Sequence, residues 1–168
     1  MTRAALLVPF PEMAAAVAPW LEHSVGARPS HGVPPHVTLL FPFPPPDDEI
    51  VLATRQLLDA VDAFDVEFTE LRRFESSKAL YLAPEPSRPF VRATGSLWNR
   101  FPAWPPYVGE FPDTTPHLTV AWGALLDEAE ADLRPRLPLR ARAREALLLT
   151  ELEPTRWVVH TSFPLAGA

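Results

Sequence analysis

The sequence contains no cysteine and no long apolar run, and each absence excludes a class of structure. Among its 168 residues cysteine is missing, which excludes disulfides, thiolate metal sites and a cysteine nucleophile. No apolar stretch approaches the roughly 18 residues that a membrane span needs. The chain begins like a signal peptide, but Pro9, Pro11 and Glu12 interrupt it before an h-region of about 7–15 residues forms. We therefore expect a soluble, cytoplasmic protein.

Basic charge is also in short supply. The chain has 15 Lys and Arg against 21 Asp and Glu, so its net charge is −6. Proteins that follow long nucleic acids normally carry a basic stripe, because neutralising phosphates supplies most of their non-specific affinity. If this protein handles nucleic acid, we expect it to take a small nucleotide or an RNA terminus.

Proline is abundant, whereas glycine is scarce. The chain has 22 prolines and 6 glycines, and proline usually makes up only ~5% of a protein. The prolines cluster between strongly patterned stretches, which favours rigid loops over a disordered chain. The length fits one compact domain, so we expect residues 1–168 to form a single domain.

Hydrophobic spacing predicts an alternation of strands and helices. Read coarsely, the order β-α-β-α-β occurs twice, which predicts two pseudo-symmetric lobes in an α+β domain. The predicted strands cover residues 4–10, 37–43, 66–74, 79–84, 118–122, 139–152 and 155–163. The predicted helices cover residues 12–23, 50–64, 89–101 and 128–133, and proline-rich loops cover 25–35 and 102–116.

One short pattern occurs once in each predicted lobe. It reads Pro35-His36-Val37-Thr38-Leu39 in the first lobe and Pro116-His117-Leu118-Thr119-Val120 in the second. Side chains alternate between the two faces of a strand. We therefore expect each histidine and threonine to share one face, and Phe41 and Trp122 to lie on the opposite, buried face.

Two imidazoles with two hydroxyls suit the hydrolysis of a cyclic phosphodiester. One neutral imidazole can remove a proton from water, and one imidazolium can give a proton to the departing ribose oxygen. The hydroxyls can donate hydrogen bonds to the non-bridging oxygens. A single His-x-Thr is more often structural than catalytic, but two copies at matching positions favour a functional site.

The paired motif resembles that of the 2H phosphoesterase superfamily, in particular its bacterial branch named for 2′-5′ RNA ligases. The resemblance covers nearly the whole chain and implies two antiparallel sheets that form a V-shaped central cleft. It also implies that His36 and His117 are catalytic and that Thr38 and Thr119 bind phosphate. Substrates of the family include 2′,3′-cyclic phosphates, 2′-5′ linkages and the cyclic phosphate of ADP-ribose.

The chain departs from the family pattern after its second motif. Many relatives place an arginine there, in a Thr-Leu-Ala-Arg-like run, whereas Thr119 is followed in this chain by Val-Ala-Trp-Gly. The missing guanidinium and the negative charge argue against ligation and against binding of long RNA. We expect a metal-independent phosphodiesterase that needs no cofactor and no obligate protein partner.

Other aromatic and basic residues are weaker candidates for substrate contacts. Tyr81, Trp104 and Tyr107 could stack on a base, although packing of the loop is an equal alternative for the latter two. A phosphate could be contacted by one of several cations that are ordinarily surface charges: Arg3, Arg73, Lys78 and Arg156. We expect Trp98, Trp122 and Trp157 to pack in the core.

The remaining histidines are assigned structural places. His23 ends a predicted helix, where an imidazolium favours the helix dipole. His31 lies in a loop and His160 in a strand, and no His, Asp and Glu grouping has the spacing of a metal site.

Two other functions fit the sequence less well. The first is a non-catalytic module of the same fold that binds a nucleotide or RNA end. The second is a proline-rich interaction protein, for which residues 42–46 are the main argument.

Overall fold

The computed structural model describes residues 2–24, 30–110 and 114–168. Residues 25–29 and 111–113, which belong to the two predicted proline-rich loops, lie outside the described residues. The described chain is an α+β fold with two four-stranded antiparallel sheets. The predicted fold class is therefore confirmed. No helix within the described ranges is long and apolar enough to cross a membrane.

The first sheet contains strands from both ends of the chain. Its strand order is β2-β1-β7-β8, and its strands are β1 (Ala4–Pro9), β2 (His36–Phe43), β7 (Glu145–Glu153) and β8 (Arg156–Pro164). The second sheet has the order β5-β4-β3-β6. Its strands are β3 (Phe64–Phe74), β4 (Ala79–Glu85), β5 (Leu118–Trp122) and β6 (Leu139–Ala143). Each sheet therefore holds one of the two motifs at an edge strand.

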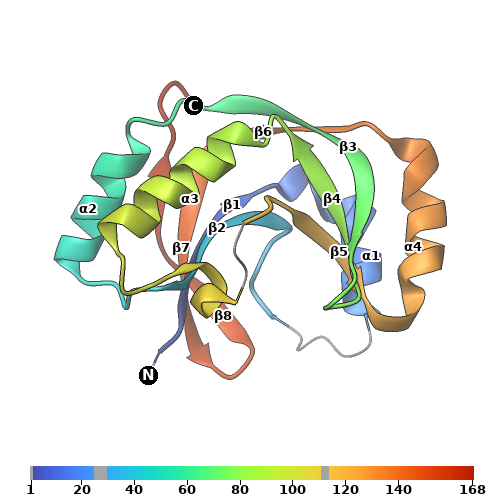
Figure 1. Cartoon of the computed structure of the whole chain (residues 1–168), viewed down its shortest axis with the longest axis horizontal. Coiled ribbons are helices and arrows are strands. Elements are labelled where there is room, and N and C mark those ends of the chain that lie inside the picture. The colour runs from blue at the N-terminus through green and yellow to red at the C-terminus, as the bar shows by residue number, and fades with distance from the viewer. Residues whose placement is uncertain (1, 25–29, 111–113) are drawn as a thin grey trace.

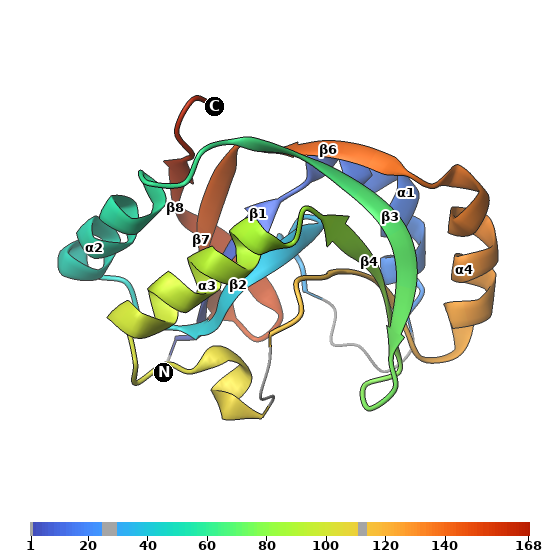
Figure 2. The ribbon, with the colours of Figure 1, turned by 45° about the horizontal axis from the view of Figure 1, so that its top comes forward.

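The helices cover the sheets crosswise. They are α1 (Ala14–Glu22), α2 (Asp48–Leu58), α3 (Arg88–Arg100) and α4 (Leu126–Leu133). Helix α1 follows β1 in the sequence but packs against β5, whereas α3 follows β4 but packs against β2. Figure 1 shows α2 and α3 on the side of the first sheet and α1 and α4 on the side of the second. Each motif strand is thus covered by the helix of the other lobe, an arrangement also visible in Figure 2.

One hydrophobic core joins the two sheets. Its cluster contains Leu6 and Val37 of the first sheet together with Leu80 and Leu118 of the second. The rings of Phe10, which follows β1, and Phe68 of β3 meet edge to face with centroids 5.3 Å apart. Because such pairs add about 0.5–1.5 kcal/mol beyond their buried area, this contact helps to fix one sheet against the other.

The predicted strand at 139–152 is wrong in one respect, because it consists of two strands. β6 pairs with β3 in the second sheet, whereas β7 pairs with β1 and β8 in the first. Arg144 lies between them, where the chain passes from one sheet to the other. Strand β3 comes from the N-terminal half of the chain but lies in the second sheet, and β7 and β8 come from the C-terminal half but lie in the first. The two lobes are therefore not consecutive halves of the sequence.

The predicted helix at 50–64 is also too long at its C-terminal end. Asp47 caps α2 as expected, and its side chain accepts a hydrogen bond of 2.8 Å from the backbone N–H of Ile50. The helix ends at Leu58, because the following residues pair with the C-terminal segment. The N–H of Ala63 donates to the carbonyl of Ala166, whose own N–H donates to the carbonyl of Val61.

Candidate functional site

His36 and His117 are held in the same way by the backbone that precedes them. Nδ1 of His36 lies 2.8 Å from the carbonyl oxygen of Pro34, and Nδ1 of His117 lies 2.7 Å from that of Thr115. A carbonyl oxygen only accepts hydrogen bonds, so each Nδ1 must carry the donated proton. The neutral ring then has its lone pair at Nε2. Nε2 is therefore the nitrogen that can accept or deliver a proton in both rings.

The motif side chains alternate as the sequence predicts. Val37 and Leu118 are fully buried, whereas the flanking residues, His36 with Thr38 and His117 with Thr119, are only partly buried. The apolar residues belong to the main hydrophobic core. The packing of this core therefore holds each histidine and threonine on the opposite face of its strand.

Each motif is followed by a β-bulge. In β2, Thr38 pairs with Leu7 and Leu40 pairs with Leu6, so Leu39 has no partner in β1. In β5, the same shift occurs after Thr119, since Tyr81 pairs with Thr119 and Leu80 with Ala121. A bulge increases the local twist and moves the following side chains to the other face.

The first bulge makes the prediction for Phe41 wrong. Phe41 does not join Val37 in the main core but packs against a smaller cluster of Leu7, Leu149 and Trp157. Its ring meets that of Trp157 edge to face, with centroids 6.3 Å apart. The extra residue in the strand reverses the alternation, which places Phe41 on the face that Thr38 shares with Leu7.

The structure brings the two motifs together. Strands β2 and β5 approach each other although they belong to different sheets. Tyr107, from a short 3₁₀ turn at Pro106–Gly109, contacts both: its phenol is hydrogen-bonded to the side chain of Thr38, and its ring centroid lies 6.4 Å from that of His117. The charge of His117 also acts on His36. The two imidazoles therefore lie within electrostatic range of each other.

The surroundings of the histidines keep both rings neutral at pH 7. Burial, opposed by the bond to Pro34 and aided by the positive charge of His117, lowers the pKa of His36 to about 4. Burial also lowers the pKa of His117, opposed by the bond to Thr115. Because the two positive charges repel each other, the doubly protonated pair is disfavoured.

An aromatic pair supports the ring of His117. Tyr81 stacks on Phe74 with centroids 4.2 Å apart, and the imidazole lies edge-on to Phe74 at 4.9 Å and to Tyr81 at 5.7 Å. Tyr81 is only 5% exposed. It therefore contributes to the wall behind His117, and most of its ring surface is already covered.

The two loop aromatics occupy different places. Trp104 packs against the main hydrophobic core, whereas Tyr107 lies between the motifs.

Tyr107 and Val108 have φ values of 51° and 53°, and Gly109 follows with 77°. The left-handed region costs about 1–2 kcal/mol per L-residue, and such strain persists only where the surroundings over-determine it, often at functional sites.

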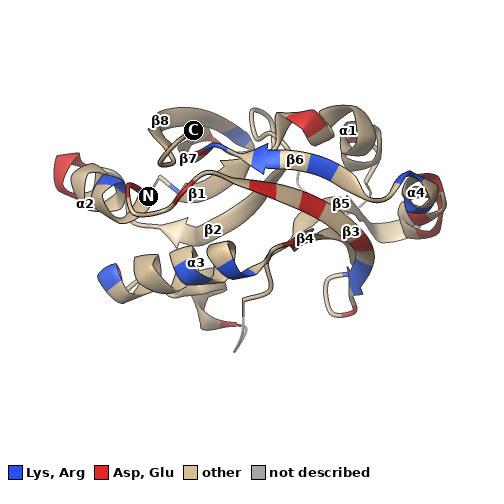
Figure 3. Ribbon diagram, turned by 90° about the horizontal axis from the view of Figure 1, so that it is seen from above, with Lys and Arg blue, Asp and Glu red and all other residues tan. Residues whose placement is uncertain are grey.

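The three arginines named from the sequence are paired with acids. Arg3 pairs with Glu151 at 2.5 Å, and Arg156 lies 3.9 Å from Glu153. Arg73 pairs with acids of α4, and Lys78 lies in the β3–β4 turn with φ 49°. The arginines of β6 also have acidic partners on β3, seen as adjacent blue and red bands in Figure 3: Arg140–Glu67 at 2.8 Å and Arg142–Asp65 at 2.9 Å.

The sequence reasoning missed Arg72, which lies on the same face of the second sheet as Thr119. Arg72 pairs with Tyr81 across β3 and β4, and Tyr81 pairs with Thr119 across β4 and β5. The signal that would have found it is the alternation along β3 combined with the register of both strand pairs. Register across strands is set by tertiary structure, so the local sequence did not reveal it.

The tryptophan expectations are met only in part. Trp157 is 9% exposed and packs in the smaller cluster, whereas Trp98 is 45% exposed, so its predicted place in the core is wrong. Trp98 faces solvent because α3 buries another stripe, which contains Phe90, Ala93 and Leu97. Trp122 is half-buried and donates its backbone N–H to Ser24 Oγ at 2.9 Å.

The other histidines have structural surroundings. His23 is the C-cap of α1, and its Nδ1 lies 2.5 Å from the carbonyl oxygen of Pro19. The backbone of His31 pairs with that of Arg156, and His160 is exposed on β8. Among the described residues, no three His, Asp or Glu side chains gather in a group that could hold a metal ion.

Comparisons with known proteins place this geometry in context. A family model described as the 2′-5′ RNA ligase superfamily matches residues 9–159. A Bacillus licheniformis protein provisionally named a phosphoesterase is 26% identical over an alignment 149 positions long, which covers 80% of this chain and 82% of that protein. Escherichia coli LigT complexed with NADP⁺ has a TM-score of 0.63 and 18% identity, with 98% of this chain and 97% of that chain covered. A Thermus thermophilus protein has a TM-score of 0.65 and 21% identity, with 98% of both chains covered. At these identities the solved structures show the fold alone.

Proposed function

Because the chain belongs to the 2′-5′ RNA ligase superfamily, whose members are 2H phosphoesterases, we propose that it is a metal-independent phosphodiesterase. Its substrates are 2′,3′-cyclic phosphates or related nucleotide phosphodiesters, such as RNA ends, 2′-5′ linkages or the cyclic phosphate of ADP-ribose. The observation that carries this proposal is the matched pair of imidazoles, each held through Nδ1 by a carbonyl and each with its reactive nitrogen at Nε2. Structures of E. coli LigT with 3′-AMP and ATP support a nucleotide substrate for this fold.

His36 is the general base and His117 the general acid in hydrolysis. This assignment rests on the surroundings of His36, whose burial lowers its pKa to about 4 and so favours its neutral form. A base must be neutral and an acid must be protonated when the substrate binds. The singly protonated pair is therefore the reactive form.

The reaction needs one water and no other co-reactant. Nε2 of His36 takes a proton from water as its oxygen bonds to phosphorus, and the bond from phosphorus to one ribose oxygen breaks. Nε2 of His117 gives its proton to that departing oxygen, which leaves a phosphate monoester. Thr38 and Thr119 donate hydrogen bonds to the non-bridging oxygens, where negative charge accumulates in the transition state.

Hydrolysis of 2′,3′-cyclic AMP tests this proposal. We expect the wild-type protein to hydrolyse it in the presence of EDTA, and His36→Ala or His117→Ala to lower the rate at least about 10²-fold, the usual scale for positioned acid–base groups. His160→Ala is the matched control, since His160 is exposed on β8. The panel should also include a 2′-5′ dinucleotide and the cyclic phosphate of ADP-ribose.

Two outcomes would contradict the proposal. If both single histidine variants hydrolyse the substrate at the wild-type rate, the acid–base assignment is wrong. If a nucleotide binds tightly and is recovered unchanged after long incubation, the protein is instead a nucleotide-binding module of the same fold.

A further inference from the structure

Arg72 lies in a row of residues that leads across the second sheet to the second motif. Arg72 of β3, Tyr81 of β4 and Thr119 of β5 are successive cross-strand partners, so their side chains share one face. Neighbouring strands lie about 4.8 Å apart, which places the backbone of Arg72 about 10 Å from that of Thr119. Arg72 therefore lies two strands away from a phosphate held by Thr119, with Tyr81 on the strand between them.

The guanidinium of Arg72 is accessible and only partly engaged. Its Nε donates to Glu70 Oε2 at 2.8 Å, its Nη2 lies 2.6 Å from the same oxygen, and the group is also hydrogen-bonded to the phenol of Tyr81. The side chains of Arg72 and Glu70 are 55% and 57% exposed. A guanidinium has five N–H donors, and an exposed ion pair contributes little to stability. Donors therefore remain for a ligand, which can also displace Glu70 at little cost.

A polar pocket adjoins Arg72. Its volume is about 270 Å³, and its polar lining residues are Arg72, the acids Glu70 and Glu85, and the hydroxyl-bearing Thr69, Ser87, Thr114 and Thr115. Thr115 is also the residue whose carbonyl holds His117. The pocket therefore extends from the residues just before the second motif to Arg72.

We propose that Arg72 and this pocket form a second phosphate subsite. It binds the phosphate one nucleotide step from the reacting one, in substrates that carry two phosphates. This inference rests on the proposed function, because that function places the reacting phosphate at Thr119. Arginine suits the role because its planar donor set matches the oxygens of a phosphate.

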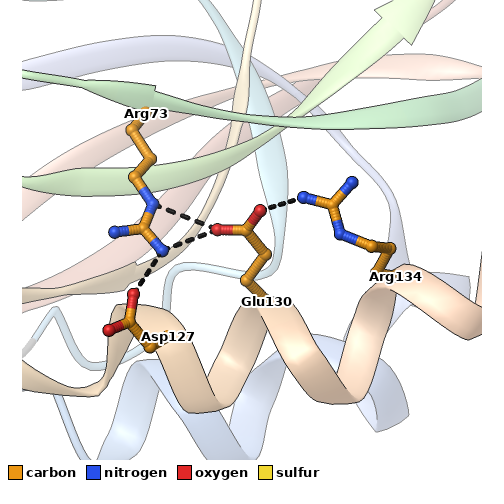
Figure 4. Close-up of polar contacts among 4 residues, drawn as sticks. All are labelled: Arg73, Asp127, Glu130 and Arg134. Atoms are coloured by element: carbon orange, nitrogen blue, oxygen red, sulfur yellow. Dashed lines mark hydrogen bonds and ion pairs between the residues drawn. The ribbon is translucent and has the colours of Figure 1, made fainter.

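Arg73 provides a matched control, because it is the next residue of the same strand and points to the other face. Its Nη2 lies 2.6 Å from both Asp127 and Glu130, and its Nε donates to Glu130 at 3.1 Å. Figure 4 shows these contacts with α4 and the bond from Arg134 to Glu130. Substitution of Arg73 removes the same charge from β3 without touching the pocket.

The test compares one-phosphate and two-phosphate substrates. We measure kcat/KM for 2′,3′-cyclic AMP and for the dinucleotide ApA that ends in a 2′,3′-cyclic phosphate. Arg72→Met should lower the ratio of the dinucleotide value to the mononucleotide value about tenfold, mainly through KM, as expected for loss of a hydrogen-bonded charge. Arg73→Met should leave the ratio unchanged, and Glu70→Gln should raise it by removing the competing carboxylate.

A binding measurement separates this inference from the proposed function. In a His36→Ala/His117→Ala background, calorimetry with adenosine 3′-monophosphate and adenosine 3′,5′-bisphosphate should show that Arg72→Met selectively weakens binding of the bisphosphate. This result would support the subsite even if the wild-type protein hydrolysed neither substrate. Equal effects of Arg72→Met on both ligands, or no greater effect than that of Arg73→Met, would overturn the subsite.

Discussion

His36 and His117 make the same backbone hydrogen bond yet do not titrate alike. Each ring donates through Nδ1 to the carbonyl two residues before it. Burial lowers the pKa of both and is the main reason that the pKa of His36 falls to about 4, with a smaller contribution from the charge of His117. The difference in protonation therefore arises from what surrounds the two rings, because their sequence motifs are equivalent.

At the residue scale, the pH dependence of kcat/KM is the first prediction. Activity should fall as pH drops toward about 4, because His36 becomes protonated and can no longer act as a base. It should also fall as pH rises through the pKa of His117, which burial holds below its usual 6.5. We expect a bell-shaped profile with its maximum on the acidic side of pH 6.5, measured with 2′,3′-cyclic AMP.

His160→Ala, which removes an exposed imidazole from β8, should leave both limbs of the profile in place. An optimum above pH 8 would contradict the lowered pKa values of the two histidines.

The sequence predicted the four motif residues because their arrangement is local. His36 and Thr38 are two positions apart on one strand, and strand alternation alone places them on one face. Arg72 and Tyr107 were harder to find or to place, because Arg72 depends on register across three strands and Tyr107 on the path of a loop. The sequence analysis gave Arg73, and not Arg72, as a candidate phosphate contact, because nothing in the local sequence distinguishes two adjacent arginines.

At the scale of elements, α3 stabilises the bulge that follows the first motif. The hydroxyl of Thr94 donates to the carbonyl of Leu39 at 2.8 Å, and Leu39 is the residue without a partner in β1. Thr94→Val keeps the side-chain shape and removes the donor. Since the contact is buried, we expect the free energy of unfolding to fall by about 1–2 kcal/mol, measured by urea denaturation.

Thr54→Val is the control for this prediction. The hydroxyl of Thr54 is buried and donates to the carbonyl of Ile50 at 2.7 Å, one turn earlier in α2. The carbonyl of Ile50 also accepts a helical backbone hydrogen bond. Thr54→Val should therefore lower the free energy of unfolding by less than Thr94→Val. A loss for Thr94→Val no larger than that for Thr54→Val would show that the Leu39 carbonyl does not depend on α3.

The bulges and the division of one predicted strand into two are features that the local sequence pattern does not predict. Residues 37–43 read as one regular strand, yet the unpaired Leu39 reverses the faces beyond it and moves Phe41 out of the main core. Residues 139–152 also read as one strand, because the apolar residues on either side of Arg144 continue without a turn signal. Both features are decided by the strands that become partners.

At the scale of the whole molecule, the crosswise packing predicts a single cooperative unfolding transition. The hydrophobic core contains residues from both sheets, and each motif strand is covered by a helix of the other lobe. Neither sheet therefore retains a complete core without the other. Tryptophan fluorescence and far-UV circular dichroism should give coincident urea curves, as expected for one domain.

Leu6→Ala in the first sheet and Leu80→Ala in the second test the coupling directly. Both side chains are fully buried, so each substitution should cost about 2–5 kcal/mol. Each should move the curves of both probes together. Two separate transitions, with each variant shifting only one of them, would show that the lobes unfold independently.

The exchange of helices also decides what a divided chain can do. A cut in the β3–β4 turn leaves β2 and His36 on one fragment and α3, which packs on β2, on the other. The same cut separates His117 from α1, which packs on β5. Each fragment thus carries one of the two motif histidines and lacks the helix that packs on its strand. The proposed chemistry would return only when both fragments reassemble, which makes the turn a natural junction for a split reporter of protein association.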